Sequence, residues 1–132
     1  MVLVDTSVWI RFLANRAPYA QALDQLLALD DVGAHELVYG ELMIGDPGGR
    51  RNFLASYIRI KQAAVVPHQE VVAFVAARKL HGRSVGWIDA HLLASAIVSR
   101  FSLWTVDSRL SQLASELGIA YQHPGPSSHR IH

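Results

Sequence analysis

The chain opens with the stretch MVLVDTSVWIRFL, residues 1–13, and this stretch decides the fold class. Residues 1–4 form a short apolar run that ends at Asp5. Asp5, Thr6 and Ser7 are residue types that begin helices, because their side-chain oxygens accept hydrogen bonds from free backbone N–H groups. The apolar residues behind them recur at helical spacing: Val8, Trp9, Phe12 and Leu13. The sequence therefore predicts a buried strand that passes through an acid into a helix.

The same order of elements returns near the other end of the chain. Residues 103–106 are rich in β-forming side chains, Asp107 follows them, and residues 108–117 have a helical pattern that stops at Gly118. Between these two units the pattern alternates in the same way. Further strands are predicted at 32–35, 63–66 and 119–122, and further helices at 18–29, 36–44, around 53–58, at 69–80 and at 85–100.

This alternation predicts an α/β fold. Strands that alternate with helices favour right-handed βαβ units, hence a parallel sheet covered by helices on both faces. Functional sites of such sheets lie at the carboxyl ends of the strands. We expect one domain over residues 1–123 and a loose tail over 124–132.

Composition narrows the function classes. Hydrophobic residues make up 51% of the 132 residues, which predicts a compact, core-rich protein. The absence of cysteine excludes disulfides and thiolate zinc sites and suits a reducing cytoplasm. The longest apolar run, 71–77, is far shorter than the ~20 residues of a membrane span, and no secretory leader is recognised. A net charge of +1 means that any nucleic acid must be attracted by local basic patches.

Two acids stand on helix faces where apolar residues are expected. Glu41 interrupts an apolar stripe that includes Leu37, Val38 and Ile44, and Asp89 interrupts a similar stripe in the helix at 85–100. A carboxylate on an apolar face is costly unless it is paired, hydrogen-bonded or bound to a metal. Asp5 and Asp107 each end a predicted strand, so the four acids are predicted to converge on one sheet edge.

Four carboxylates without a cation would repel one another, and a divalent ion relieves that repulsion. Hard oxygen ligands without cysteine favour Mg²⁺ or Mn²⁺ over Zn²⁺. The chemistry that follows is attack of metal-activated water on a phosphodiester. Ser7, Thr105 and Ser108 lie within two residues of the strand-end acids. Their hydroxyls are predicted to orient the metal ligands or metal-bound waters through hydrogen bonds.

Each of these residues also has a structural interpretation. Asp5 and Asp107 could be ordinary helix N-caps, and Glu41 and Asp89 could be buried partners of arginines such as Arg11 or Arg109. The histidines are interpreted as surface or packing residues: His35, His68, His81 and His91. Three aromatic residues fit core positions, namely Trp9, Phe12 and Trp104, while Trp87 is open to packing or base stacking.

The basic clusters and the glycine-rich stretch carry less specific signals. Residues 50–61 and 78–83 contain Arg and Lys that are interpreted as solvated faces, with phosphate contact as the alternative. Residues 45–49 lack the following Lys-Ser/Thr of a phosphate loop and are interpreted as a helix-ending turn.

Taken together, the acid-bearing motifs carry a family resemblance. Val4-Asp5-Thr6-Ser7, Glu41 within 37–42, Asp89 within 88–94 and Thr105-Val106-Asp107 resemble the signature of the PIN-domain family, whose short bacterial members include the VapC toxins. The resemblance implies a three-layer α/β/α sandwich with a mainly parallel central sheet. It also implies that the four acids bind Mg²⁺ or Mn²⁺ and cut single-stranded or looped RNA, commonly tRNA or ribosomal RNA. A homodimer and inhibition by a VapB-type antitoxin are implied as well. The match departs at His91, where many relatives have an apolar residue, and we expect His91 to be exposed.

The leading hypothesis is therefore a metal-dependent endoribonuclease toxin with Asp5, Glu41, Asp89 and Asp107 as catalytic metal ligands. Its alternative is a non-catalytic interaction module whose acidic pocket receives a basic partner. A Mg²⁺-dependent phosphatase is a third reading, but it would normally offer a phosphate-gripping lysine, and none is suitably placed.

Overall fold

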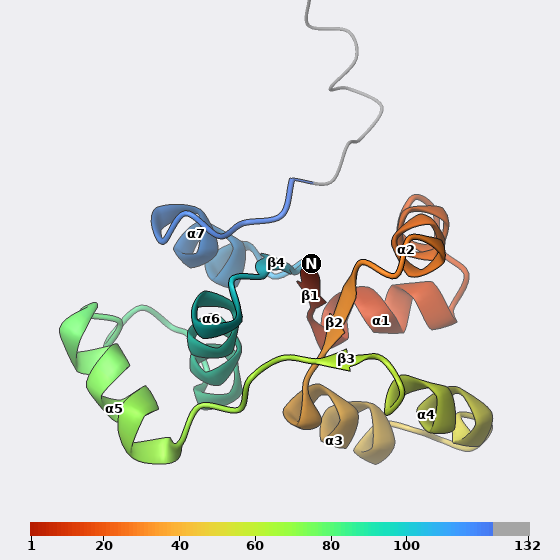
Figure 1. Cartoon of the computed structure of the whole chain (residues 1–132), viewed down its shortest axis with the longest axis horizontal. Coiled ribbons are helices and arrows are strands. Elements are labelled where there is room, and N and C mark those ends of the chain that lie inside the picture. Colours follow the sequence, from red (N-terminus) through yellow and green to blue (C-terminus); the bar gives the residue numbers. More distant parts are fainter. Residues whose placement is uncertain (123–132) are drawn as a thin grey trace, which may run out of the picture.

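The computed structural model describes residues 1–122 and places them in alternating strands and helices (Figure 1). The elements follow one another in the order β1 (Val2–Val4), α1 (Thr6–Leu13), α2 (Tyr19–Ala28), β2 (Val32–Ala34), α3 (Glu36–Ile44), α4 (Arg51–Tyr57), β3 (Lys61–Gln62), α5 (His68–Ala77), α6 (Trp87–Ser99), β4 (Ser102–Trp104) and α7 (Ser108–Glu116). The predicted tail, 124–132, lies outside the described residues.

The four strands form one parallel sheet in the order β3-β2-β1-β4. β1 is central, with Val2 opposite Val32 of β2 and Val4 opposite Trp104 of β4. In Figure 1, α1 and α2 lie on one side of the sheet, and α5, α6 and α7 lie on the other. The predicted three-layer α/β/α architecture with a parallel sheet is confirmed.

Two predicted strands need correction. The third strand is Lys61–Gln62, not 63–66. The Ala63 N–H donates to the Ala34 carbonyl (2.8 Å), and the chain then leaves the sheet. The next N–H, of Ala64, donates to Ser99 Oγ of α6. The predicted last strand at 119–122 is reduced to one isolated bridge, between Leu103 and Ala120.

The helix beginning at 85 in the sequence prediction starts at Trp87. Gly86 is still extended, with φ −75° and ψ 165°, and the Asp89 carboxylate accepts a hydrogen bond from its N–H. A side chain that binds the N–H of the residue before a helix fixes the helix start. The preceding helix, α5, ends at Ala77 rather than at 80, in a loop where Lys79 has a positive φ of 55°.

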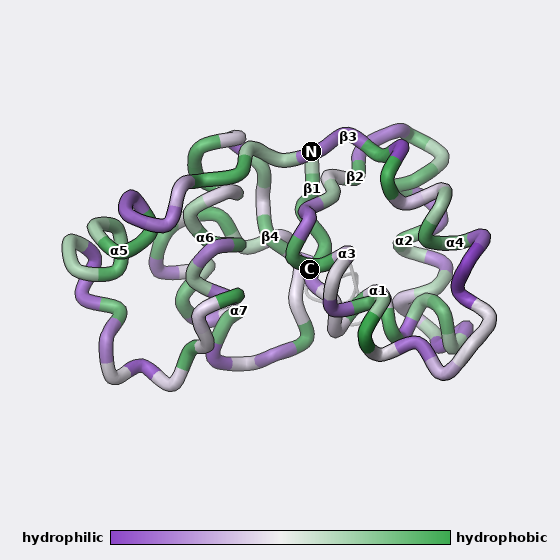
Figure 2. Tube along the Cα trace, turned by 90° about the horizontal axis from the view of Figure 1, so that it is seen from below, coloured by the Kyte–Doolittle hydropathy of each residue, from purple (hydrophilic) through white to green (hydrophobic). Residues whose placement is uncertain are grey.

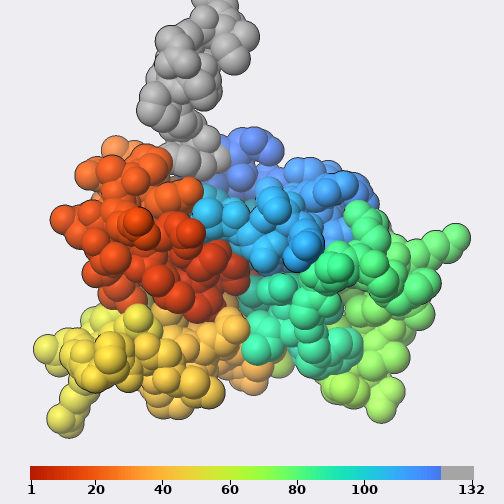
Figure 3. Space-filling model, turned by 180° about the vertical axis from the view of Figure 1, so that it is seen from behind, coloured from red at the N-terminus to blue at the C-terminus, as the bar shows by residue number. Residues whose placement is uncertain are grey.

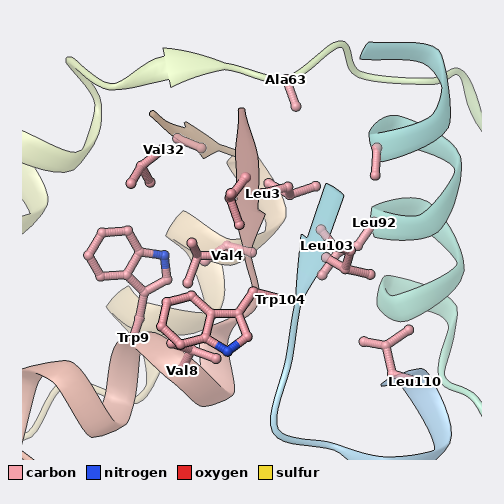
Figure 4. Packing of buried hydrophobic residues seen from close by; sticks show 14 of the residues in the cluster. Leu3, Val4, Val8, Trp9, Val32, Ala63, Leu92, Leu103, Trp104 and Leu110 are labelled. Atoms are coloured by element: carbon pink, nitrogen blue, oxygen red, sulfur yellow. The ribbon is translucent and has the colours of Figure 1, made fainter. Parts of the chain in front are cut away.

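The core lies on both faces of β1, whose three residues are all buried. Figure 4 shows Leu3 pointing toward Leu92 and Leu103, while Val4 points toward Val8 and Trp9. A strand buried on both faces is apolar throughout, as residues 2–4 are. Trp9 and Trp104 are core residues, as predicted, with exposed fractions of 0% and 4%.

At one margin of the sheet, the edge strand β3 is short and hydrophilic (Figure 2). Both of its residues, Lys61 and Gln62, are exposed. Short, charged edge strands resist pairing with other chains. The helices are short too, and within residues 1–122 none combines the length and the apolar character that crossing a membrane requires.

Candidate active site

The carboxyl edge of the sheet gathers polar residues from segments far apart in sequence. Asp5 follows β1, His35 follows β2 and Thr105 follows β4. Because Val4 is paired with Trp104, Asp5 and Thr105 leave the sheet side by side. Figure 3 views the molecule from behind, where α1 (red), α3 (gold), α6 (blue-green) and the start of α7 (blue) meet.

Asp5 is a buried carboxylate, with an exposed fraction of 7%. It precedes α1, yet its side chain makes no capping hydrogen bond to that helix. Its Oδ2 instead accepts hydrogen bonds from Ser7 Oγ (2.7 Å) and Thr105 Oγ1 (2.8 Å). Two hydroxyls from separate elements therefore hold this carboxylate in one orientation, and the N-cap interpretation of Asp5 is wrong.

Glu41 is partly buried on α3 and is tied to α1. Thr6 Oγ1 donates a short hydrogen bond of 2.6 Å to Glu41 Oε1. Sequence reasoning missed Thr6, although it lies between Asp5 and Ser7 in the first turn of α1. Its position places three consecutive residues in the same polar site.

Asp89 lies in the first turn of α6, and its pKa is raised. Burial, with the negative charge of Asp5 as the next largest cause, raises its pKa to about 6. The Gly86 N–H partly offsets this rise, and the charges of Asp107 and Glu41 add to it. All three other acids therefore lie within electrostatic reach of Asp89.

Asp107 is exposed and does act as a helix N-cap. Its Oδ1 accepts hydrogen bonds from the backbone N–H groups of Arg109 (2.9 Å) and Leu110 (3.0 Å). The structural interpretation of Asp107 is thus confirmed. It does not exclude a second role, because Oδ2 accepts no hydrogen bond within residues 1–122.

None of the four acids has a cationic partner in the described part of the chain. The ion pairs found there join the N-terminus to Asp31 and Arg83 to Glu116. Arg11 donates to the Ser7 carbonyl and lies over the Tyr19 ring, so it does not neutralise Glu41 or Asp89. The arginine-pairing interpretation of these two acids is therefore wrong for residues 1–122.

The donor chemistry of this group fits a hard divalent cation. One oxygen of each carboxylate accepts a hydrogen bond from the protein, while the other accepts none within residues 1–122: Asp5 Oδ1, Glu41 Oε2, Asp89 Oδ1 and Asp107 Oδ2. Oxygen-only ligand sets favour Mg²⁺ or Mn²⁺. No three acidic or histidine side chains of residues 1–122 are already gathered as the ligands of one ion. Mg²⁺ keeps several of its own waters and needs only one or two carboxylates as direct ligands, so these oxygens still suit it.

His35 is a second residue that sequence reasoning underrated. It is fully buried at the end of β2, and the Leu37 N–H donates to its Nδ1 (3.0 Å), which caps α3. The neutral ring then carries its proton on Nε2, which donates to Ser95 Oγ of α6 (2.9 Å). Burial lowers the pKa of His35, so the neutral form is favoured. This bond connects the helices that carry Glu41 and Asp89.

Of the remaining sequence interpretations, some are confirmed and others are wrong. Ser108 is exposed and makes no side-chain hydrogen bond in the described residues, unlike Ser7 and Thr105. His91 is partly buried rather than exposed, with its ring against Trp87. α3 ends at Ile44 before Gly45, which confirms the helix-ending turn.

A cavity of about 360 Å³ lined by Arg78 and Arg100 lies at the amino end of β4, remote from the acids.

Comparisons with known proteins agree with this geometry. A family model described as "PIN domain" matches residues 2–116. A protein named Ribonuclease VapC32, from two strains of Mycobacterium tuberculosis (CDC 1551 / Oshkosh and ATCC 25618 / H37Rv), is 45% identical over 121 residues, covering 91% of this chain and 95% of the relative. The crystal structure of PAE2754 from Pyrobaculum aerophilum superposes with a TM-score of 0.54, 17% identity, and coverage of 89% and 88% of the two chains. At that identity it supports the fold alone.

Proposed function

The chain belongs to the PIN-domain family, and from this premise we propose that it is a metal-dependent endoribonuclease, the toxin of a VapBC-type toxin–antitoxin pair. The observation that carries the proposal is the group of four carboxylates that share one sheet edge without a cationic partner in residues 1–122. The 45% identity to Ribonuclease VapC32 supports RNA as the substrate.

In this proposal Asp5, Glu41, Asp89 and Asp107 would hold one or more Mg²⁺ or Mn²⁺ ions through their free oxygens. When bound, the cation supplies an activated water and offsets charge at the phosphodiester. Ser7 and Thr105 keep Asp5 oriented, and Thr6 keeps Glu41 oriented. Hydrolysis would break the bond between phosphorus and the 3′ oxygen and leave 5′-phosphate and 3′-hydroxyl ends.

The protonation state of Asp89 couples cation binding to pH. Burial, and after it the charge of Asp5, disfavours the ionised form of Asp89 and raises its pKa. A cation reverses this preference, because it favours the ionised carboxylate. Metal binding should therefore release a proton near pH 6, and the site is complete only when Asp89 is ionised.

The partners follow from the same family relationship. We place the protein in the cytoplasm, with a VapB-type antitoxin as its inhibitor and a second copy of the chain as its partner in a homodimer. Size measurement of the purified chain, alone and with the product of the neighbouring coding region, checks both associations.

The decisive experiment is cleavage of total cellular RNA by the purified, antitoxin-free chain with Mg²⁺ or Mn²⁺. Matched reactions contain EDTA or the Asp5→Asn variant. Discrete fragments that require both the cation and Asp5 are expected. Absence of cleavage with either cation, from folded protein, would support the interaction-module alternative.

A further inference from the structure

One tryptophan of the chain differs from the other two. Trp9 and Trp104 are core residues, exposed by 0% and 4%, whereas Trp87 is 43% exposed. An exposed indole contributes little to the core, and exposed aromatic residues are a common feature of binding surfaces. Trp87 was also the one tryptophan for which the sequence left packing and base stacking open.

The exposed indole is held in place. Its ring lies 5.1 Å from the His68 ring at 57° and 5.0 Å from the His91 ring at 88°. His68 begins α5 and His91 lies one turn further along α6, so two elements support the ring. A side chain that is already ordered loses little conformational entropy when a ligand stacks on it. The arrangement is therefore suited to a planar aromatic ligand.

Trp87 shares the amino end of α6 with Asp89. It is the first residue of α6 and follows Gly86, whose N–H donates to Asp89 Oδ2 (3.3 Å), so Trp87 and Asp89 both lie at the amino end of this helix. Two residues span about 200° around a helix, so the indole and the carboxylate leave α6 on opposite faces. Both are at the carboxyl edge of the sheet, where the four acids meet. An unpaired strand that passes the amino end of α6 would bring one nucleotide to the acids and a neighbouring base to the indole.

Space and charge at this position favour a base over a phosphate. A cavity of about 150 Å³ lies beside the indole, with Val75, Leu80 and Ala90 in its apolar wall. Arg83 also lines the cavity, but it is paired with Glu116. Without a cation the acids repel phosphate, and Arg83 is held by Glu116, so RNA binding by metal-free protein at this position must come from an uncharged contact. Stacking on an aromatic ring is such a contact.

Resting on the ribonuclease function proposed above, we propose that Trp87 stacks on an unpaired RNA base next to the cleaved phosphate, with His68 and His91 as its supports. Trp87 is a positioning residue and takes no part in the chemical step. Every base has a π-face, so recognition tolerates different bases. The larger ring system of a purine offers more area to stack on the indole than a pyrimidine does. Paired RNA is excluded because a base must be unpaired before its face can reach the indole, and unpairing costs free energy.

The test compares the wild-type chain with Trp87→Phe and Trp87→Ala. Val98→Ala is the matched control, since Val98 is 60% exposed near the far end of the same helix. Metal-free protein in EDTA is titrated with a short unpaired oligoadenylate, with oligouridylate and with an RNA duplex. Tryptophan fluorescence and cleavage kinetics are both measured, and circular dichroism checks that each variant is folded.

Oligoadenylate should quench the wild-type fluorescence more than oligouridylate, and the duplex should not quench it. The quench should disappear in both Trp87 variants, since Trp9 and Trp104 are buried. Trp87→Ala should raise KM about tenfold with kcat nearly unchanged, while Trp87→Phe recovers most of the loss and Val98→Ala has no effect.

The outcomes separate this inference from the ribonuclease proposal. Cleavage by the wild type with unchanged KM and no quench change in Trp87→Ala overturns the stacking role and leaves the nuclease intact. A Trp87-dependent quench without any cleavage supports base binding and contradicts the nuclease. Loss of antitoxin binding in Trp87→Ala, with RNA binding unchanged, assigns the surface to a protein partner and overturns the proposal.

Discussion

The ends of β1 and β4 use the same residue types in opposite ways. In both, a strand leads through an aspartate into a helix, yet Asp5 is buried and leaves its helix uncapped while Asp107 is exposed and caps its helix. The register explains the difference. Val4 is paired with Trp104, so the position equivalent to Asp5 is Thr105, and Asp107 lies two residues beyond the sheet edge. Local sequence shows that an aspartate follows each strand. The pairing of β1 with β4 decides whether that aspartate lies at the sheet edge or caps the next helix.

Of the residues at the two strand ends, Asp5 is expected to have the largest effect on cleavage when it is replaced. Asp5→Asn should lower cleavage by more than the roughly 100-fold that loss of a ligand's hydrogen-bond partner costs. The metal-free variant should be at least as stable as wild type, because one charge that repels Asp89 is removed. Asp24→Asn, an exposed substitution on α2, is the control for both cleavage rate and urea unfolding. Full activity in Asp5→Asn would contradict the assignment.

The next largest effect is expected at Thr105, which connects the two strand ends. Its Oγ1 donates to Asp5 Oδ2 and accepts a hydrogen bond from the Asp107 N–H (3.1 Å). Thr105→Val should weaken Mg²⁺ or Mn²⁺ binding by roughly 10- to 100-fold. Thr105→Ser keeps the hydroxyl and should bind nearly as wild type in a metal titration. Equal affinities in the two variants would show that the hydroxyl is not needed.

At Asp107 the capping role and the charge can be separated. Asp107→Ala removes both and should cost about 0.5–2 kcal/mol of unfolding free energy, whereas Asp107→Asn keeps a good N-cap and should cost little. Both should reduce cleavage if the charge matters. Urea unfolding beside cleavage assays measures the two contributions, and cleavage at the wild-type rate in Asp107→Asn would confine Asp107 to capping.

The smallest expected effect is on the pKa of Asp89, which the charges of Asp5 and Asp107 raise by different amounts. In metal-free protein, NMR titration should give Asp89 a pKa of about 6, and Asp5→Asn should lower that pKa more than Asp107→Asn, since Asp5 is the larger cause. An equal or opposite ranking would mean that Asp107 lies as near to Asp89 as Asp5 does.

The same shift has a consequence for stability with a definite sign. The folded pKa of about 6 exceeds the ordinary value of 3.8, so the folded state binds the proton more tightly. This contribution to stability is present below the ordinary value and is lost as the pH rises through about 6. Urea unfolding in EDTA across this range should show the loss in wild type and its absence in Asp89→Asn.

The sequence predicts those parts of the site that local patterns report. Glu41 and Asp89 stand out because a helix has a period that shows an acid among apolar neighbours. Thr6 and His35 do not stand out, because their partners are Glu41 and Ser95, 35 and 60 residues away. The contact between His68 and Trp87 is hidden for the same reason. The error at β3 arose because an apolar run does not prove a strand: only Ala63 and Val66 of 63–66 are buried, and Val66 packs against α5 and α6 rather than within the sheet.

The pairing of β1 with β4 also sets when the site can exist. Asp5 depends on a hydroxyl 100 residues further along the chain, so a ribosome must translate nearly the whole described chain before that carboxylate is oriented. Until then a nascent chain carries Asp5, Glu41 and Asp89 without the strand that aligns the first of them. For the proposed nuclease, the complete site is therefore expected to form only after the segment that carries Thr105 has left the ribosome.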